Sequence, residues 1–296
     1  MLHQRDPWRV SLHGGHSGQF CDHAEDSLRE VLQAAVDFGY HTFGVSEHAP
    51  RTMARFLYDE EKNRGWTVET LAQMFQDYQT TLAALAEEFS DRLIVLRGFE
   101  SEVVPTEDYI RNTQRWRAQM KPDFIVGSVH HVHQLIIDGP PDSFAKAMEL
   151  CGGLEALAVE YYRLLAQMIQ DLQPEVVGHF DLIRKKAGPH GNVDTPTTRK
   201  AARLALDAAE AHNCILDLNT AGWSKGLPTA YPAPWLLAEA NRRGLGFCFG
   251  DDSHGPSTVG RDIERGRDYL LDNGITTITG LTKEDGQVVR RTWSLV

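Results

Sequence analysis

The stretch Gly246-Phe-Cys-Phe-Gly-Asp-Asp-Ser-His254 joins a short apolar run to a group of polar residues. Residues 246–249 have the composition of a buried β-strand, and two aspartates and a histidine follow within the next five positions. Carboxylates and imidazoles placed directly after a buried strand are the residue types that hold a divalent metal ion. The same arrangement recurs along the chain, and this recurrence predicts the fold.

Six further short runs have β-strand character and alternate with longer amphipathic stretches. The seven predicted strands cover 8–12, 41–45, 92–96, 123–126, 175–177, 214–218 and 246–249. Apolar residues at helical spacing predict helices over 27–39, 71–85, 106–120, 142–172, 200–212, 233–243 and 261–272. The first helix begins with a Ser27–Glu30 capping box and ends at Gly39, and the last one closes the series.

Regular alternation of strands and helices indicates parallel strands joined by helical crossovers. We therefore expect an α/β fold in which residues 1–296 form a single closed or nearly closed barrel. A doubly wound open sheet is the alternative. No strand is followed by a GxGxxG or GxxxxGK[ST] sequence, so nothing supports a dinucleotide or P-loop site. Residues 49–66 form a polar connection that could be a substrate lid or a surface excursion.

Composition narrows the classes of partner and compartment. The formal net charge of −11 over 296 residues argues against a nucleic-acid binder. No apolar run approaches the ~20 residues that span a bilayer, and the first residues lack the apolar stretch of a secretory signal. None of the four cysteines forms a CxxC pair, so we expect free thiols in a reducing, cytoplasmic compartment. The oligomeric state stays open.

Metal-ligand residue types gather at the predicted strand ends. The candidates are His13, His16, His23, His48, Glu100, His130, His179, Asp252 and His254. Because the carboxyl ends of parallel barrel strands open on one face, these residues should converge. Imidazoles and carboxylates packed together are costly to desolvate, whereas bound divalent cations use them as donors. The set is too large for one ion, so we expect two or three ions bridged by Glu100.

The remaining histidines among the 13 in the chain fall outside this pattern. We interpret four of them as structural or surface residues: His3, His41, His190 and His212. His131 and His133 follow the fourth strand closely, and each could either support a ligand or be exposed.

Several motifs occur in a specific order along the chain. They are Ser46-Glu-His-Ala-Pro50, Gly127-Ser-Val-His130, Gly178-His-Phe-Asp181, Asn219-Thr-Ala-Gly222 and Gly250-Asp-Asp-Ser-His254. In these motifs the sequence resembles the PHP (polymerase and histidinol phosphatase) family of metal-dependent phosphoesterases, and within it the histidinol-phosphate phosphatase branch. The resemblance extends over essentially the whole chain and implies a distorted (β/α)7 barrel with a trinuclear metal site.

The resemblance also implies a ligand set for each ion. One ion would take the N-terminal histidines, Glu100 and Asp252; a second would share Glu100 with His130 and His179; a third would take His23, His48 and His254. Zinc, iron and manganese each fit such nitrogen and oxygen ligands.

One departure from the family pattern concerns the first ligands. The family usually opens with His-x-His, whereas this chain has His13-Gly-Gly-His16, which makes His16 the safer ligand. His13 is one residue out of register. The two glycines could bulge and restore its reach, or that ligand could be lost and one ion weakened.

The activity that the resemblance implies is phosphomonoester hydrolysis. The concrete hypothesis is conversion of L-histidinol phosphate to L-histidinol and phosphate, in histidine biosynthesis, by in-line attack of a metal-bridged hydroxide. Glu100, Asp252 and His254 would be catalytic. Arg51, Arg184 and Asn219 are the candidates for substrate binding, although each arginine could equally be a solvated surface residue. Gly255-Pro256 occupies the position where family members often carry a basic residue.

Three other functions remain open at this point. A PHP phosphoesterase could act on nucleotides or on another small phosphate ester. A metal-dependent amidohydrolase also gathers histidines at barrel strand ends, but none of the seven motifs presents the strand-end lysine often found there. A non-catalytic metal-binding protein would have less reason to keep so many ligand types.

Overall fold

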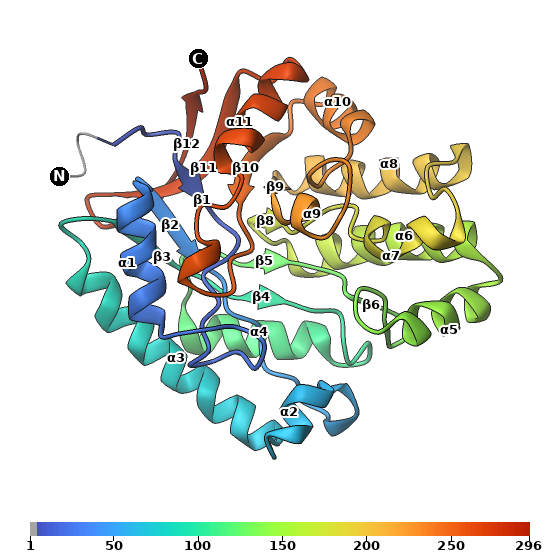
Figure 1. The fold of residues 1–296 in the computed structure, drawn as a ribbon, viewed down its shortest axis with the longest axis horizontal. Helices are drawn as coiled ribbons and strands as arrows, with labels where there is room; N and C mark the ends of the chain where they lie inside the picture. The colour runs from blue at the N-terminus through green and yellow to red at the C-terminus, as the bar shows by residue number, and fades with distance from the viewer. Residues whose placement is uncertain (1–4) are drawn as a thin grey trace.

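The computed structural model describes residues 5–296, and its centre is a sheet of parallel strands surrounded by helices (Figure 1). Neighbouring strands pair in the order β3-β2-β1-β10-β9-β8-β5-β4, and every pair is parallel. The strands are β1 Val10–Ser11, β2 Thr42–Val45, β3 Ile94–Arg97, β4 Glu100–Ser101, β5 Val126–Gly127, β8 Val176–Val177, β9 Ile215–Asn219 and β10 Gly246–Gly250. The predicted α/β class and parallel pairing are confirmed.

The strands β3 and β4 are two halves of one interrupted strand, and together they close the sheet. Between them, Gly98 N donates to Val45 O at 2.9 Å, while Phe99 O accepts from Val126 N at 3.0 Å. The chain therefore bonds to β2 on one side and to β5 on the other, which makes a seven-stranded barrel. A Cβ atom on Gly98 would lie 2.5 Å from the ring of Phe124, so glycine leaves the room that this ring fills inside the barrel.

Helices cover the outside of the barrel (Figure 1). The long ones are α1 Leu28–Phe38, α3 Val68–Glu88, α4 Tyr109–Met120, α5 Pro141–Cys151, α6 Leu154–Leu172, α8 Pro196–Ala211, α10 Pro234–Arg242 and α11 Ile263–Asp272. Short turns of helix are η2 Ala54–Phe56, α2 Asp59–Asn63, α7 Arg184–Ala187, η3 Gly188–His190, α9 Ala221–Ser224 and η4 Pro256–Thr258. The predicted capping box is present in α1, and Gly39 ends that helix with a φ of 92°.

The predicted helix over 261–272 is confirmed as α11, and a β-hairpin that was not predicted follows it. The hairpin consists of antiparallel β11 Thr277–Glu284 and β12 Gln287–Ser294. Asp285 and Gly286 at its turn have φ angles of 49° and 77°. An Asp-Gly pair with positive φ at both positions is a strong hairpin signal, and the sequence carries it.

This C-terminal hairpin lies against the amino ends of the barrel strands. The Oγ1 atom of Thr282 lies 2.9 Å from that of Thr42, at the start of β2. The ammonium group of Lys283 lies 2.6 Å from Asp123, just before β5. The hairpin therefore forms a floor at the end of the barrel opposite the predicted ligands.

Two smaller features complete the fold. A short hairpin of β6 His131–Val132 and β7 Leu135–Ile136 follows β5, and the polar connection over 49–66 contains η2 and α2. The four cysteines are free, as expected. Among the described residues, no helix combines the length and the hydropathy that crossing a bilayer requires.

Candidate metal centre

The predicted ligands lie at the carboxyl ends of the barrel strands, around a cavity of about 250 Å³. Its lining includes His23, His48, Glu100, His130, His179, Asp252 and His254. His13 and His16 are fully buried beneath it. Since one water occupies ~30 Å³ of liquid, the cavity has room for a small molecule.

The carboxylate of Glu100 is the point where the predicted ligands meet. Its Oε1 atom lies 3.3 Å from Nε2 of His13, 3.4 Å from Nε2 of His179 and 3.7 Å from Nε2 of His130. Its Oε2 atom lies 2.9 Å from Nδ1 of His48. Burial alone would raise the pKa of Glu100, but the imidazoles of His13 and His130 hold it well below its usual range. The group is therefore a carboxylate placed to bridge ions.

The donor atoms of the described residues fall into compact groups. Within each group, all donor atoms lie within 4.8 Å of one another. The groups include His13, His16 and Glu100; Glu100, His130 and His179; His16, Asp252 and His254; and Cys21, His23, His48 and His254. The groups of Glu100 with His130 and His179, and of His23, His48 and His254 with Cys21 added, have the members that the family resemblance implies, whereas Asp252 groups with His16 and His254 and not with His13 and Glu100.

The structure brings both His13 and His16 to the site despite the shifted register. Between them, Gly14 and Gly15 have φ angles of 143° and 80°, which residues with a side chain rarely adopt. The resulting bulge lets His13 O accept from Asp252 N at 3.0 Å. It also places Nε2 of His16 3.9 Å from Oδ1 of Asp252.

Several ring nitrogens at the site are buried and have no hydrogen-bond partner. They are Nε2 of His13, His16 and His48, and Nδ1 of His179. A buried polar atom left unpaired costs ~1–3 kcal/mol, so four of them around one carboxylate need an explanation. In addition, Nε2 of His130 lies only 3.1 Å from Nε2 of His179. Divalent cations would satisfy the Nε2 atoms of His13, His16 and His48 and would account for the facing Nε2 atoms of His130 and His179, so the residues present fit a metal centre.

Three carboxylates orient the ligand histidines from behind, and sequence reasoning missed all three. The pairs are Asp217 with Nδ1 of His13 at 2.7 Å, Glu47 with Nδ1 of His16 at 3.0 Å and Glu102 with Nδ1 of His130 at 2.7 Å. Such pairs fix which ring nitrogen faces the metal. A sequence signal existed for Asp217, because an acidic residue in the middle of an apolar strand needs a buried partner.

The charges around each imidazole set its protonation in the metal-free protein. Burial would lower the pKa of His130, but Glu100 and Glu102 raise it to about 9. His48 and His254 behave in the opposite way. Burial, together with the neighbouring imidazole of His16, lowers the pKa of His48 well below its usual range and that of His254 to about 3. His130 thus holds a proton that an ion would displace, whereas His48 and His254 are already neutral.

Two predicted ligands have strained backbones. Asp252 has a φ of 48° and His179 a φ of 21°, in the region that favours glycine. Such conformations cost ~1–3 kcal/mol and cluster at functional sites, where the surrounding structure holds them. At Asp252 the strain accompanies the hydrogen bond to His13 O, so it helps to set the position of the carboxylate.

Of the two arginines predicted to bind substrate, Arg184 lies outside the lining of this cavity, and Arg51 lines a smaller neighbouring cavity together with His48, Glu100 and His130. The guanidinium of Arg51 is 3.1 Å from Glu61 and stacks over Tyr58, with 3.9 Å to the ring centroid. The guanidinium of Arg184 is 3.0 Å from Asp181. Both cations are therefore already paired with a buried carboxylate.

Asn219, the third predicted substrate contact, is fully buried and supports the site from below. Its Nδ2 atom donates to Asp217 at 3.0 Å, and its Oδ1 atom accepts from Ala221 N at 3.0 Å. The side chain thereby holds the carboxylate that orients His13.

The cationic side chains that line the cavity are Lys185, Lys225 and Arg261. The Nε atom of Arg261 is buried without a hydrogen-bond partner. The ammonium group of Lys185 lies 2.9 Å from Asp138, and burial lowers the pKa of Lys225. No motif pointed to these residues, because the loops that bring them to the cavity are defined only by the fold.

The structure shows where His131 and His133 lie, the two histidines for which the sequence allowed either a supporting or an exposed position. His131 is buried, with Nδ1 3.3 Å from Glu102, whereas His133 is exposed in the β6–β7 turn. His41, His190 and His212 lie away from the cavity, and His3 falls outside the described residues.

Comparisons with known proteins agree with this geometry. Residues 12–221 match the PHP domain family. The Schizosaccharomyces pombe protein named probable histidinol-phosphatase is 33% identical over 278 residues, which are 93% of this chain and 90% of that protein.

Two solved structures share the fold. A Listeria monocytogenes protein has a TM-score of 0.76 at 22% identity, covering 86% of this chain and 99% of its own. Histidinol phosphate phosphatase from Lactococcus lactis, solved with zinc, L-histidinol and phosphate, has a TM-score of 0.65 at 19% identity, covering 95% and 99%. The family match and the identity to the yeast protein lead to one conclusion: the chain belongs to the PHP domain family and, within it, groups with the histidinol-phosphatases.

Proposed function

We propose that this protein is a metal-dependent phosphomonoesterase that hydrolyses L-histidinol phosphate to L-histidinol and phosphate in histidine biosynthesis. The observation that carries the proposal is the Glu100 carboxylate with four imidazoles around it, at the base of a cavity that cations line. The name of the yeast relative and the ligands of the Lactococcus lactis structure support the choice of substrate.

The metal centre would hold two or three divalent ions: zinc, iron or manganese. Nitrogen and oxygen donors suit each of these metals. Bound ions would supply Lewis acidity toward the phosphoryl oxygens and would acidify water for attack on phosphorus. Glu100 would join the first two ligand sets, and Asp252 and His254 would complete the sets on the side of β10.

Besides the metal ions, the cationic side chains that line the cavity would bind the phosphate group. Arg261 is the leading candidate, because its buried Nε–H has no partner among the described residues and guanidinium matches phosphate geometry. Lys225 lines the same cavity. Among the lining residues, Asp138 is the acidic side chain outside the proposed ligand set, so it would accept from the amine of histidinol.

A phosphoesterase that acts on nucleotides or on another small phosphate ester is the second candidate. A groove of about 670 Å³ adjoins the cavity and shares Tyr58, Asp138 and Lys185 with it. Phe56 and Ile136 give this groove an apolar surface that could take a larger leaving group.

Phosphate release by the metal-loaded protein separates these candidates. We expect kcat/KM for L-histidinol phosphate to exceed that for nucleotide monophosphates by about 100-fold, with metal analysis of the same sample giving two or three ions per chain. Asp252→Asn should abolish most of the activity. The matched control is Asp268→Asn, at an exposed position of α11. A preference for nucleotides would overturn the substrate, and full activity of Asp252→Asn would overturn the catalytic assignment.

A further inference from the structure

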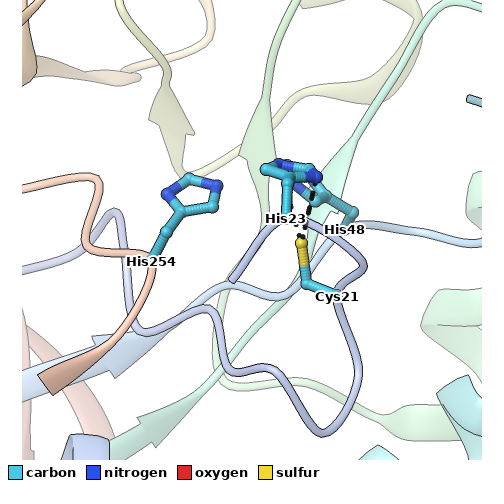
Figure 2. A group of neighbouring side chains, drawn as sticks. All are labelled: Cys21, His23, His48 and His254. Atoms are coloured by element: carbon cyan, nitrogen blue, oxygen red, sulfur yellow. Dashed lines mark hydrogen bonds between the residues drawn. The ribbon is translucent and has the colours of Figure 1, made fainter. Parts of the chain in front are cut away.

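Cys21 lies beside the third group of imidazoles, and its position is unusual for a thiol with no assigned role. The residue is only 3% exposed. Its Sγ atom and the donor nitrogens of His23, His48 and His254 all lie within 4.8 Å of one another. Figure 2 shows the sulfur directed at the imidazoles of His23 and His48.

The separations within this group match those of donors that share one ion. A zinc ion binds sulfur at ~2.3 Å and nitrogen at ~2.0 Å, so two such donors at a tetrahedral angle lie ~3.5 Å apart. The Sγ atom of Cys21 is 3.4 Å from Nδ1 and 3.6 Å from Nε2 of His23. The Nδ1 atom of the same ring is 3.1 Å from Asp22, which leaves Nε2 as the ligand atom.

The other two imidazoles also present nitrogens to this group. The Nδ1 atom of His48 is bound to Glu100 at 2.9 Å, and its Nε2 atom is buried without a partner. The Nδ1–H group of His254 donates to the carbonyl oxygen of Asp252 at 2.9 Å, which leaves Nε2 available. A hydrogen bond from the thiol to His23 alone would leave the buried nitrogen of His48 unexplained.

We propose that Cys21 is a fourth protein ligand of the third metal position, which makes that position a Cys-His3 site selective for zinc. The inference rests on the proposed function, since it assumes that the metal centre forms. Thiolate is a soft ligand that favours zinc, whereas manganese prefers the carboxylate-containing sets around Glu100 and Asp252. Zinc should therefore be retained at the third position when manganese occupies the other two.

Cobalt substitution tests this assignment with a readout independent of activity. Metal-free protein is titrated with Co²⁺, and sulfur coordination produces a near-ultraviolet charge-transfer band. We expect the band in the natural protein and in Cys151→Ser, a half-buried cysteine on α5, and its loss in Cys21→Ser. Zinc affinity at this position should fall at least about tenfold in Cys21→Ser.

Thiol protection gives a second measurement that needs no variant. Alkylation mapped by mass spectrometry should modify Cys21, which is only 3% exposed, during transient opening of the metal-free protein, and should modify it more slowly once zinc is bound at all positions. If the natural protein binds cobalt and is an active phosphatase but shows no charge-transfer band, the role of Cys21 is overturned and the proposed function is left intact. Failure to bind cobalt, together with absence of phosphatase activity, would overturn both.

Discussion

The Nδ1 atom of His13 lies 2.7 Å from Oδ2 of Asp217, and both side chains are fully buried. This contact turns Nε2 of the same ring toward Glu100, at 3.3 Å. A carboxylate in the middle of β9 thus orients a ligand from the loop after β1, and Asn219 holds that carboxylate in turn. The position of the out-of-register histidine depends on this chain of contacts.

Asp217→Asn should weaken metal binding at the set that contains His13. The amide keeps the size of the side chain but loses the charge that favours a proton on Nδ1, so we expect about a 10- to 100-fold loss of metal affinity. Equilibrium dialysis with zinc measures it. Asp181→Asn is the control, because Asp181 is equally buried but pairs with Arg184, and it should affect stability alone. Equal metal affinities in the two variants would contradict the role of Asp217.

Metal binding should release protons at neutral pH. In the metal-free protein the pKa of His130 is about 9, above its ordinary value of 6.5, so the ring is protonated at pH 7. An ion binds only the unprotonated nitrogen and must displace that proton. Affinity should therefore rise between pH 7 and pH 9, by up to about tenfold per unit for each proton displaced.

Calorimetric titration in buffers of different ionisation enthalpy counts these protons. Glu102→Gln is the informative variant, because it removes one of the two carboxylates that raise the pKa of His130. It should release fewer protons at pH 7 than the natural protein. Identical proton release in both proteins would mean that His130 is not the group displaced.

Arg261→Gln should raise KM for the phosphate ester. Loss of a hydrogen bond to a charged group costs ~1.5–3 kcal/mol, or about 10- to 100-fold in binding. The inhibition constant of inorganic phosphate should rise in parallel. Arg184→Gln serves as the comparison, because Asp181 and Thr229 already engage that guanidinium, so it should lower the melting temperature with little change in KM. The reverse pattern would return phosphate binding to Arg184.

Thr282→Val should destabilise the protein without changing kcat. The substitution removes one of two contacts of the fully buried Thr42 hydroxyl, which also lies 2.9 Å from Nδ1 of His41, so we expect a loss of ~0.5–1.5 kcal/mol. Chemical denaturation measures this loss. Thr292→Val removes a similar hydroxyl contact, to Thr279, at an exposed position and should cost much less. If Thr282→Val lowers the free energy of unfolding as little as Thr292→Val does, the contact between the floor and β2 adds little stability.

The barrel could be predicted from the sequence because each strand carries two signals at once. A short β-rich run predicts the strand, and the metal-ligand residue that follows predicts where the strand ends. Gly246–Gly250, followed by Asp252, is an example. The two C-terminal strands were not predicted, because no metal-ligand residue follows either of them. Their Asp285-Gly286 turn was nevertheless a signal for a hairpin. The break at Gly98 also has no local signal, since it reflects the room that Phe124 needs.

The site could be predicted in its ligand types but not in the contacts between them. Spacing placed Glu100 and His130 at strand ends, whereas the pairing of Asp217 with His13 joins residues 204 positions apart. Paired arginines and free ones also look alike in a sequence. The pairing of Arg51 with Glu61 and of Arg184 with Asp181 therefore could not be predicted, and their role in phosphate binding stays a prediction beside that of Arg261.

The floor formed by β11 and β12 imposes an order on assembly during synthesis. Every proposed ligand has been made once the ribosome has passed His254, but the hairpin over 277–294 follows later. Until it emerges, the apolar lower end of the barrel has no cover, and the chain cannot complete its core. We therefore expect stable metal capture by the finished centre only after residues 277–294 have left the ribosome.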